Sequence, residues 1–218
     1  MIGNALPPAA REALSSEHLP SQHPRADRFI AEICAEFPAF RIVPKAGNRF
    51  SLLIDLALKV VTFGAQNRYM TQYHTVIGNT LYVPTSWPRM SDIDRVILLR
   101  HERVHLRQRR RMGLLPMAFV YLVPFFPLGL AYGRARIEWE AYCETLRAIA
   151  ELKGLGALRD RGLRADIIRR FTGGDYGWMW PFPSQLEAWY EQQVLALEAE
   201  HVDPVASRMR TAERQQDG

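Results

Sequence analysis

Two histidines four positions apart enclose a glutamate in the stretch His101-Glu102-Arg103-Val104-His105. On an α-helix, residues four apart lie on the same face, so both imidazoles can bind one Zn²⁺. Glu102 then stands beside the metal, where its carboxylate can take a proton from a bound water. This pattern predicts a zinc site that hydrolyses amide bonds.

The residues around this motif favour the helix that it needs. Ser91 or Asp92 can cap the start of the helix, and no Pro or Gly interrupts the run from Ser91 to Met112. Apolar residues recur along this run at helical spacing, at Ile93, Val96, Ile97, Leu98, Leu99 and Val104. We therefore expect one continuous helix that carries both histidines.

A catalytic zinc ion normally has three protein ligands and one open position, so a third ligand is expected downstream. The run from Arg134 to Lys153 is predicted to be a second helix, because Gly133 precedes it, Gly154 follows it and apolar residues recur along it. Two glutamates near its start, Glu138 and Glu140, are the candidate third ligands.

Here the chain resembles the gluzincin metallopeptidases, the clan that includes thermolysin and the CAAX prenyl endopeptidases. In that clan the third zinc ligand is a glutamate in a second helix. A small residue follows it three positions later and an aspartate four positions later. Glu138 with Ala141 fits this frame, and Glu140 is the weaker candidate. The resemblance extends from Ser91 to Thr145.

The resemblance implies a zinc peptidase with Zn²⁺ as cofactor and a peptide or protein as substrate. It implies that His101, His105 and Glu138 are the metal ligands and that Glu102 is the general base. Where the clan commonly has an aspartate that orients a ligand histidine, this chain has Tyr142. A phenol can accept one hydrogen bond from an imidazole N–H, but it brings no negative charge to the ligand.

Length and composition limit the fold and the setting of the chain. With 218 residues, 48% of them hydrophobic, the chain can bury a core and is expected to form one domain over 25–200. The segments 1–24 and 201–218 lack an apolar period and are expected to be flexible. Cys34 and Cys143 are too few for a disulfide framework, and no signal sequence is recognisable, which predicts a cytoplasmic protein.

The formal net charge is +5, and much of the excess lies in Arg107, Arg109, Arg110 and Arg111. Cations in the last turns of a helix complement the helix dipole, so this run is interpreted as a solvated helix end. The alternative interpretation is a basic surface that binds nucleic acid or an anionic membrane. Nucleic acid is not an expected partner.

Short patterns predict the elements before the zinc helix. Three of them are a helix over Arg25 to Glu36, a strand over Phe40 to Pro44 and an apolar helix over Phe50 to Phe63. Two β-rich runs, Tyr73 to Ile77 and Thr80 to Val83, enclose Gly78-Asn79, a pair typical of a tight hairpin turn. The chain is therefore predicted to have an α+β fold, mostly helical, with a small antiparallel sheet before the zinc helix.

The resemblance gives this hairpin a functional implication. Gluzincins typically lay a peptide substrate antiparallel to a sheet edge above the zinc helix, and the hairpin would supply that edge. Tyr82 or His74 could then reach the oxyanion that forms during hydrolysis. The simpler interpretation is that both are ordinary half-buried strand residues.

The segment from Met112 to Gly133 contains 22 residues and no charge, a length that could cross a bilayer. A straight span at about 1.5 Å per residue would hold His105 and Glu138 about 30 Å apart, which excludes a shared zinc ion. The segment also contains three prolines, Pro116, Pro124 and Pro127. It is therefore predicted to turn back, either as an apolar lid or as a peripheral membrane contact.

An aromatic loop from Gly173 to Pro183 separates two further predicted helices, Leu158 to Phe171 and Ser184 to about Glu200. Such a loop is more often a plug that seals a core than a ligand platform. If it contributes to a substrate pocket instead, Tyr176 is the candidate residue.

The function expected from these observations is hydrolysis of peptide bonds by a zinc-activated water with Glu102 as base. The alternative, from a different class, is a non-catalytic protein stabilised by zinc. That protein would dock on a membrane or a partner through segment 112–133 and the arginine-rich helix. Substitution of Glu102 by Gln separates the two, because only the peptidase loses its function while it keeps zinc.

Overall fold

The computed structural model describes residues 22–45, 74–122, 131–173 and 179–202. The expected helix over Phe50 to Phe63, the loop residue Tyr176 and most of both terminal segments lie outside these ranges. Within them the fold is α+β, mostly helical with one small sheet, as predicted. The helices in chain order are α2 (Pro24–Glu36), η1 (Trp87–Arg89), α4 (Asp92–Met112), α5 (Leu114–Leu122), α6 (Tyr132–Lys153), η2 (Leu155–Arg159), α7 (Arg161–Thr172) and α8 (Pro183–Val202).

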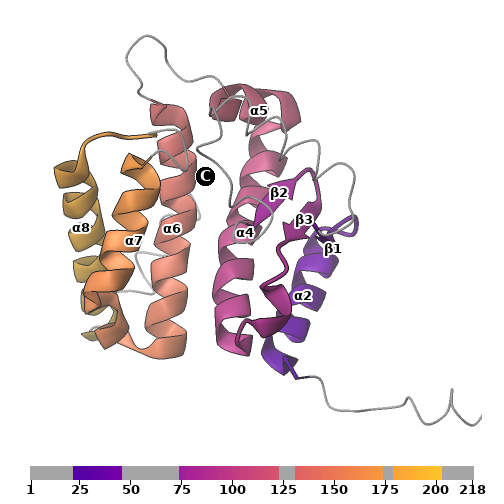
Figure 1. Ribbon diagram of the computed structural model, residues 1–218, viewed down its shortest axis with the longest axis horizontal. Helices are drawn as coiled ribbons and strands as arrows, with labels where there is room; N and C mark the ends of the chain where they lie inside the picture. Colours follow the sequence, from indigo (N-terminus) through magenta and orange to yellow (C-terminus); the bar gives the residue numbers. More distant parts are fainter. Residues whose placement is uncertain (1–21, 46–73, 123–130, 174–178, 203–218) are drawn as a thin grey trace, which may run out of the picture.

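The long helices α4 and α6 lie side by side at the centre of the molecule and run antiparallel (Figure 1). α2 and the sheet lie on the outer side of α4, whereas α7 and α8 lie on the outer side of α6. α5 crosses one end of the pair. The two helices predicted to carry zinc ligands are thus direct neighbours.

The start of α4 shows how the sequence specifies this helix. The Ser91 hydroxyl accepts a hydrogen bond from the backbone N–H of Asp94 at 3.1 Å, which makes Ser91 the N-cap. Asp92, the other candidate cap, instead accepts the backbone N–H groups of Arg25 at 3.1 Å and Ala26 at 2.9 Å. Asp92 therefore caps the start of α2 and joins that helix to α4.

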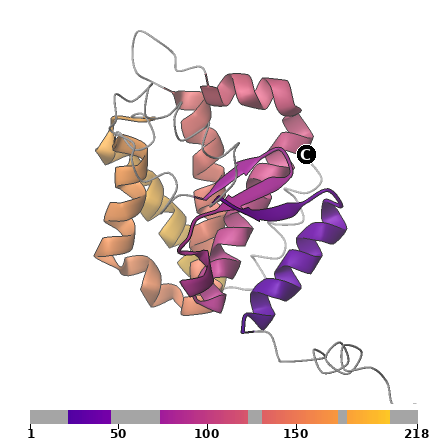
Figure 2. The same cartoon turned by 45° about the vertical axis from the view of Figure 1, so that its right-hand side comes forward.

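The sheet has three strands, β1 (Arg41–Pro44), β2 (Thr75–Ile77) and β3 (Thr80–Val83), in the order β1-β3-β2 (Figure 2). The predicted hairpin is confirmed: β2 is antiparallel to β3, and Gly78 in the turn has a φ of +62°, which glycine adopts without steric cost. β1 pairs with β3 in parallel, so the sheet is mixed. β3 is consequently the central strand, and β2 is an edge of the described sheet.

Buried apolar side chains form two cores. The first joins α6, α7 and α8 with Ile97 of α4, and it includes Leu146, Phe171 and Tyr190. The second joins α2, the sheet and α4 and includes Ile33, Leu81, Leu99 and Leu106. α4 thus contributes side chains to both cores and connects them.

The chain reverses direction between α4 and α6, as predicted for the segment from Met112 to Gly133. α5 packs against the start of α6, where a Cβ on Gly133 would lie only 2.5 Å from Cγ1 of Val120. This close approach requires glycine at position 133. In the described part of the chain, no helix is both long and apolar enough to cross a membrane.

Candidate metal centre

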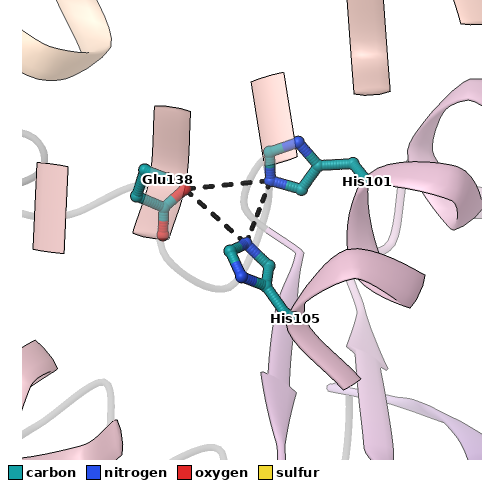
Figure 3. A group of neighbouring side chains, drawn as sticks. All are labelled: His101, His105 and Glu138. Carbon is teal, nitrogen blue, oxygen red and sulfur yellow. Dashed lines mark hydrogen bonds and ion pairs between the residues drawn. The ribbon is translucent and has the colours of Figure 1, made fainter. Parts of the chain in front are cut away.

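Three predicted ligands meet where α4 faces α6 (Figure 3). The Nε2 atoms of His101 and His105 are 3.2 Å apart, and Oε2 of Glu138 lies 3.8 Å from the first and 3.7 Å from the second. All three side chains are largely shielded from solvent. Ala141, fully buried one turn after Glu138, lets the two helices approach closely. The antiparallel helices thus bring together residues that are far apart in the sequence.

His101 is held by a hydrogen bond from the second helix. Its Nδ1 lies 3.0 Å from Oγ1 of Thr145, and this hydroxyl donates its own proton to the carbonyl of Ala141 at 3.1 Å. A hydroxyl has one proton, so Thr145 must accept a hydrogen bond from Nδ1–H of His101. The lone pair of His101 is then on Nε2, which faces His105 and Glu138.

His105 has an equivalent partner on its own helix. Its Nδ1 lies 2.9 Å from Oε1 of Gln108, an amide oxygen that can only accept. Nδ1 therefore carries a proton, and Nε2 is the nitrogen that faces Glu138 and His101. Two imidazole nitrogens and one carboxylate oxygen, each already directed to one point, are a donor set that suits zinc.

The charges of this cluster are tightly coupled. Burial and the neighbouring His105 lower the pKa of His101 to about 3. Burial also disfavours the charged form of His105, but the carboxylate of Glu138 outweighs this effect and raises its pKa to about 9. The carboxylate of Glu138 therefore favours positive charge on the neighbouring imidazole of His105.

Glu102 is buried beside the cluster and is not one of its three members. Adjacent helix residues point about 100° apart, so Glu102 cannot share the direction of His101. Burial raises the pKa of Glu102 to about 7, although His105 and Lys45 act in the opposite direction. The carboxylate thus stands next to the ligands and is available to exchange a proton.

Two cations that the sequence patterns did not single out act on this region. Lys45 is fully buried at the end of β1, and Arg170 lies near the end of α7. Both act electrostatically on Glu102 and on His74. Lys45 and Arg170 are both more than 50 residues away from Glu102 in the sequence. No local sequence pattern could therefore predict that they lie near it.

Tyr142 lies against the site in a different way from the expected one. Its ring meets the ring of His101 edge to face at 4.9 Å, and its hydroxyl is hydrogen bonded with Arg170. Thr145 makes the hydrogen bond to His101 that the resemblance assigned to position 142. Tyr142 therefore packs a ligand ring and holds Arg170 nearby, and burial raises its pKa.

The remaining candidates lie in different surroundings. Tyr82 is half-buried on the central strand β3, opposite Val43 and Thr75, so its strand is not a free edge. His74, just before β2, packs against Trp87, and burial lowers its pKa to about 4. Tyr176 lies outside the described residues.

Glu140, the weaker ligand candidate, points away from the three ligand atoms. Its carboxylate accepts a hydrogen bond from Gln108 at 2.9 Å and lies 3.5 Å from Arg111. The sequence did contain a signal for Gln108, because it lies one helical turn after His105 on the same face. Thr145 carries a similar signal, because it lies one helical turn after Ala141 on the same face of the second helix.

Comparisons of the chain with protein-family models, with curated proteins and with solved structures gave no match. The functional argument therefore depends on the site itself.

Proposed function

We propose that this protein is a zinc-dependent peptidase of the gluzincin type. The observation that carries the proposal is the convergence of His101, His105 and Glu138, with each imidazole directing Nε2 to the same point and Glu102 beside them. Three protein ligands leave a fourth position for water, which is the arrangement of a catalytic rather than a structural zinc site.

A zinc ion bound there would lower the pKa of its water and polarise a carbonyl oxygen. Glu102 takes a proton from the attacking water and later gives it to the leaving amine. The positive charges of Lys45 and Arg170 favour negative charge that develops near Glu102. An extended peptide would pair with β2, one of the two edge strands of the described sheet, and not with the central strand β3.

The test compares wild-type protein with Glu102→Gln, both loaded with zinc, on a mixed peptide library read by mass spectrometry. We expect cleavage by the wild type, loss of cleavage on chelation, and a rate lower by at least about 10²- to 10⁴-fold in the variant. Zinc content, measured by plasma mass spectrometry, should be equal in the two proteins. Gln keeps the size of Glu but cannot accept the proton.

Two results would overturn the proposal. One is a Glu102→Gln variant that cleaves at close to the wild-type rate. The other is a zinc-loaded wild type that cleaves no peptide in the library, which would favour a binding function.

A second candidate function is non-catalytic docking on an anionic membrane. The observation that favours it is the exposure of Leu115 and Phe119, 80% and 67%, one turn apart on α5. If docking is the function, the protein sediments with vesicles of phosphatidylcholine and phosphatidylglycerol, and Leu115→Ser with Phe119→Ser abolishes this. Leu195→Ser, at an exposed leucine of α8, is the matched control. Vesicle binding that is absent in the wild type excludes this function.

A further inference from the structure

Gln108 is a buried amide between the two helices of the metal centre. It is only 2% exposed, and all of its hydrogen-bonding groups have partners. Its Nε2 donates to the backbone carbonyl of Ile137 at 3.0 Å and to the carboxylate of Glu140 at 2.9 Å. Its Oε1 faces Nδ1 of His105 at 2.9 Å.

These partners leave one orientation for the amide. The carbonyl of Ile137 and the carboxylate of Glu140 are both acceptors, so the NH₂ group must face them. A flipped amide would put oxygen against oxygen at both contacts. The amide oxygen therefore accepts from Nδ1–H of His105, and this fixes the proton of the imidazole away from the metal side.

Gln108 also binds the second helix, α6, at Ile137, the residue before the predicted ligand Glu138. Ile137 directly precedes Glu138, so the hydrogen bond to its carbonyl fixes the backbone that presents the ligand carboxylate. One side chain thus contacts a ligand imidazole on α4 and the support of a ligand carboxylate on α6. An apolar residue at position 108 could make neither of these two hydrogen bonds.

The hydrogen bonds from His105 to Gln108 and from Gln108 to Glu140 form a chain in which each group donates to the next, and the chain ends at the carboxylate of Glu140. Glu140 accepts from the NH₂ group of Gln108, which polarises the amide and makes its oxygen a stronger acceptor. That oxygen in turn accepts from His105. A carboxylate therefore supports the ligand imidazole through one intervening amide, where related sites use a direct carboxylate.

We propose that Gln108 is the positioning residue of this metal centre, and that Glu140 acts through it on His105. This inference rests on the metal site of the proposed function, and it gives Glu140 a role other than that of a ligand. The consequence is that metal affinity depends on two residues that do not touch the metal.

The experiment measures zinc affinity by competition with a chromogenic chelator, which needs no substrate. We expect Gln108→Leu to weaken zinc binding about 10- to 100-fold, because it removes all three hydrogen bonds of the amide. The absorption spectrum of the Co²⁺-substituted protein should change in the same variant, since the orientation of one ligand changes. Glu140→Gln should weaken zinc binding less, because the amide partner stays but the charge is lost.

A charge swap distinguishes positioning from simple helix stapling. In the double variant Gln108→Glu with Glu140→Gln, the new carboxylate accepts directly from His105 and the new amide donates to it. The double variant loses the hydrogen bond to the carbonyl of Ile137, because a carboxylate cannot donate, but it keeps the acceptor for His105. We therefore expect zinc affinity within about tenfold of the wild type if support of His105 is what matters, whereas Gln108→Glu alone also sets two carboxylates against each other and binds zinc less tightly.

Tyr190→Phe provides the matched control. Its hydroxyl makes a buried hydrogen bond to the backbone carbonyl of Leu158 at 2.7 Å, which is the same class of interaction in the other core. This variant should lose stability without a change in zinc affinity or in the Co²⁺ spectrum. If Gln108→Leu behaves like Tyr190→Phe, the inference is wrong while the metal site stands. If the wild type binds no zinc, the proposed function fails as well.

Discussion

Glu138 and Glu140 are two residues apart on α6, which places their side chains about 200° apart around the helix axis. Glu138 is buried and reaches both imidazoles, whereas the side chain of Glu140 is 51% exposed and binds Gln108 and Arg111. The same carboxylate group thus faces the two imidazoles at one position and the amide of Gln108 at the other.

Glu138→Ala is expected to remove zinc, because two imidazoles alone hold the ion weakly. Glu140→Ala should keep zinc at near one equivalent when the metal is in excess, because the three ligands remain. The measurement is metal content by plasma mass spectrometry after gel filtration. Zinc that survives unchanged in Glu138→Ala would show that the ligand assignment is wrong.

At the same scale, Thr145→Val keeps the shape of the side chain but removes the hydroxyl that accepts from Nδ1–H of His101, so that the backbone of Ala141 is left as its partner. We expect zinc affinity to fall about tenfold, measured by chelator competition. Thr172→Val is the matched control, because Thr172 donates to the carbonyl of Ile168 at 3.1 Å in α7, in the same way as Thr145 does to Ala141. Equal zinc affinity in all three proteins would contradict this role for Thr145.

At the scale of elements, the arginine-rich face of α4 anchors α2. The carboxylate of Glu36, the last residue of α2, accepts from Arg103 at 2.7 Å, from Arg107 at 2.8 Å and from Arg110 at 3.2 Å. The guanidinium of Arg110 also lies over the ring of Phe37, 4.9 Å from its centroid. Arg107 and Arg110 of the basic run are therefore held inside the fold by the carboxylate of Glu36.

The hydrogen bonds from Arg107 and Arg103 lower the pKa of Glu36 to about 2 from its usual 4.5. A lowered pKa means that this group stabilises the fold above pH about 4.5, and that the contribution is lost as the pH falls toward 2. Glu36→Gln should therefore reduce the free energy of unfolding by about 1–3 kcal/mol at pH 7 and by about half as much or less at pH 3.

Urea unfolding of the metal-free protein at both pH values measures this difference. Glu32→Gln is the control, because Glu32 lies one turn earlier on α2, is 50% exposed and is 3.9 Å from Arg103. A stability difference for Glu36→Gln that does not depend on pH would refute the role of its charge.

At the scale of the whole molecule, the candidate metal centre lies between two cores. The core of α6, α7 and α8 presents Glu138, and the core of α2, the sheet and α4 presents both histidines. A metal ion bound by all three residues would therefore join the two halves of the molecule. Its binding free energy would add to the free energy of folding.

We accordingly expect zinc to stabilise the wild type against urea by about 2.7 kcal/mol when free zinc is 100 times the dissociation constant. His105→Ala should show no such dependence on zinc, because one ligand is missing. The measurement is a series of urea unfolding curves in zinc buffers at fixed pH. A wild-type midpoint that is the same with zinc and with excess chelator would contradict the idea that the metal joins the cores.

Features that depend on neighbours in the chain could be predicted from the sequence. The cap at Ser91, the continuous helix through His101 and His105, and the hairpin at Gly78 all follow from contacts within a few residues, and the structure contains each of them. The parallel pairing of β1 with β3 was not predicted. β1 and β3 are far apart in the chain, and no local sequence pattern specifies which distant strand β1 pairs with.

The sequence by itself determined that two imidazoles share a helix face, because helical geometry fixes residues four apart. Only the tertiary structure decided what the other elements bring to them: Thr145 behind His101, Glu140 behind Gln108, and Lys45 and Arg170 near Glu102. These partners depend on how α4 packs against α6 and on how the sheet and α7 lie beside them. That packing buries the apolar side chains of both cores together. No short stretch of sequence specifies it, because the side chains come from the whole chain.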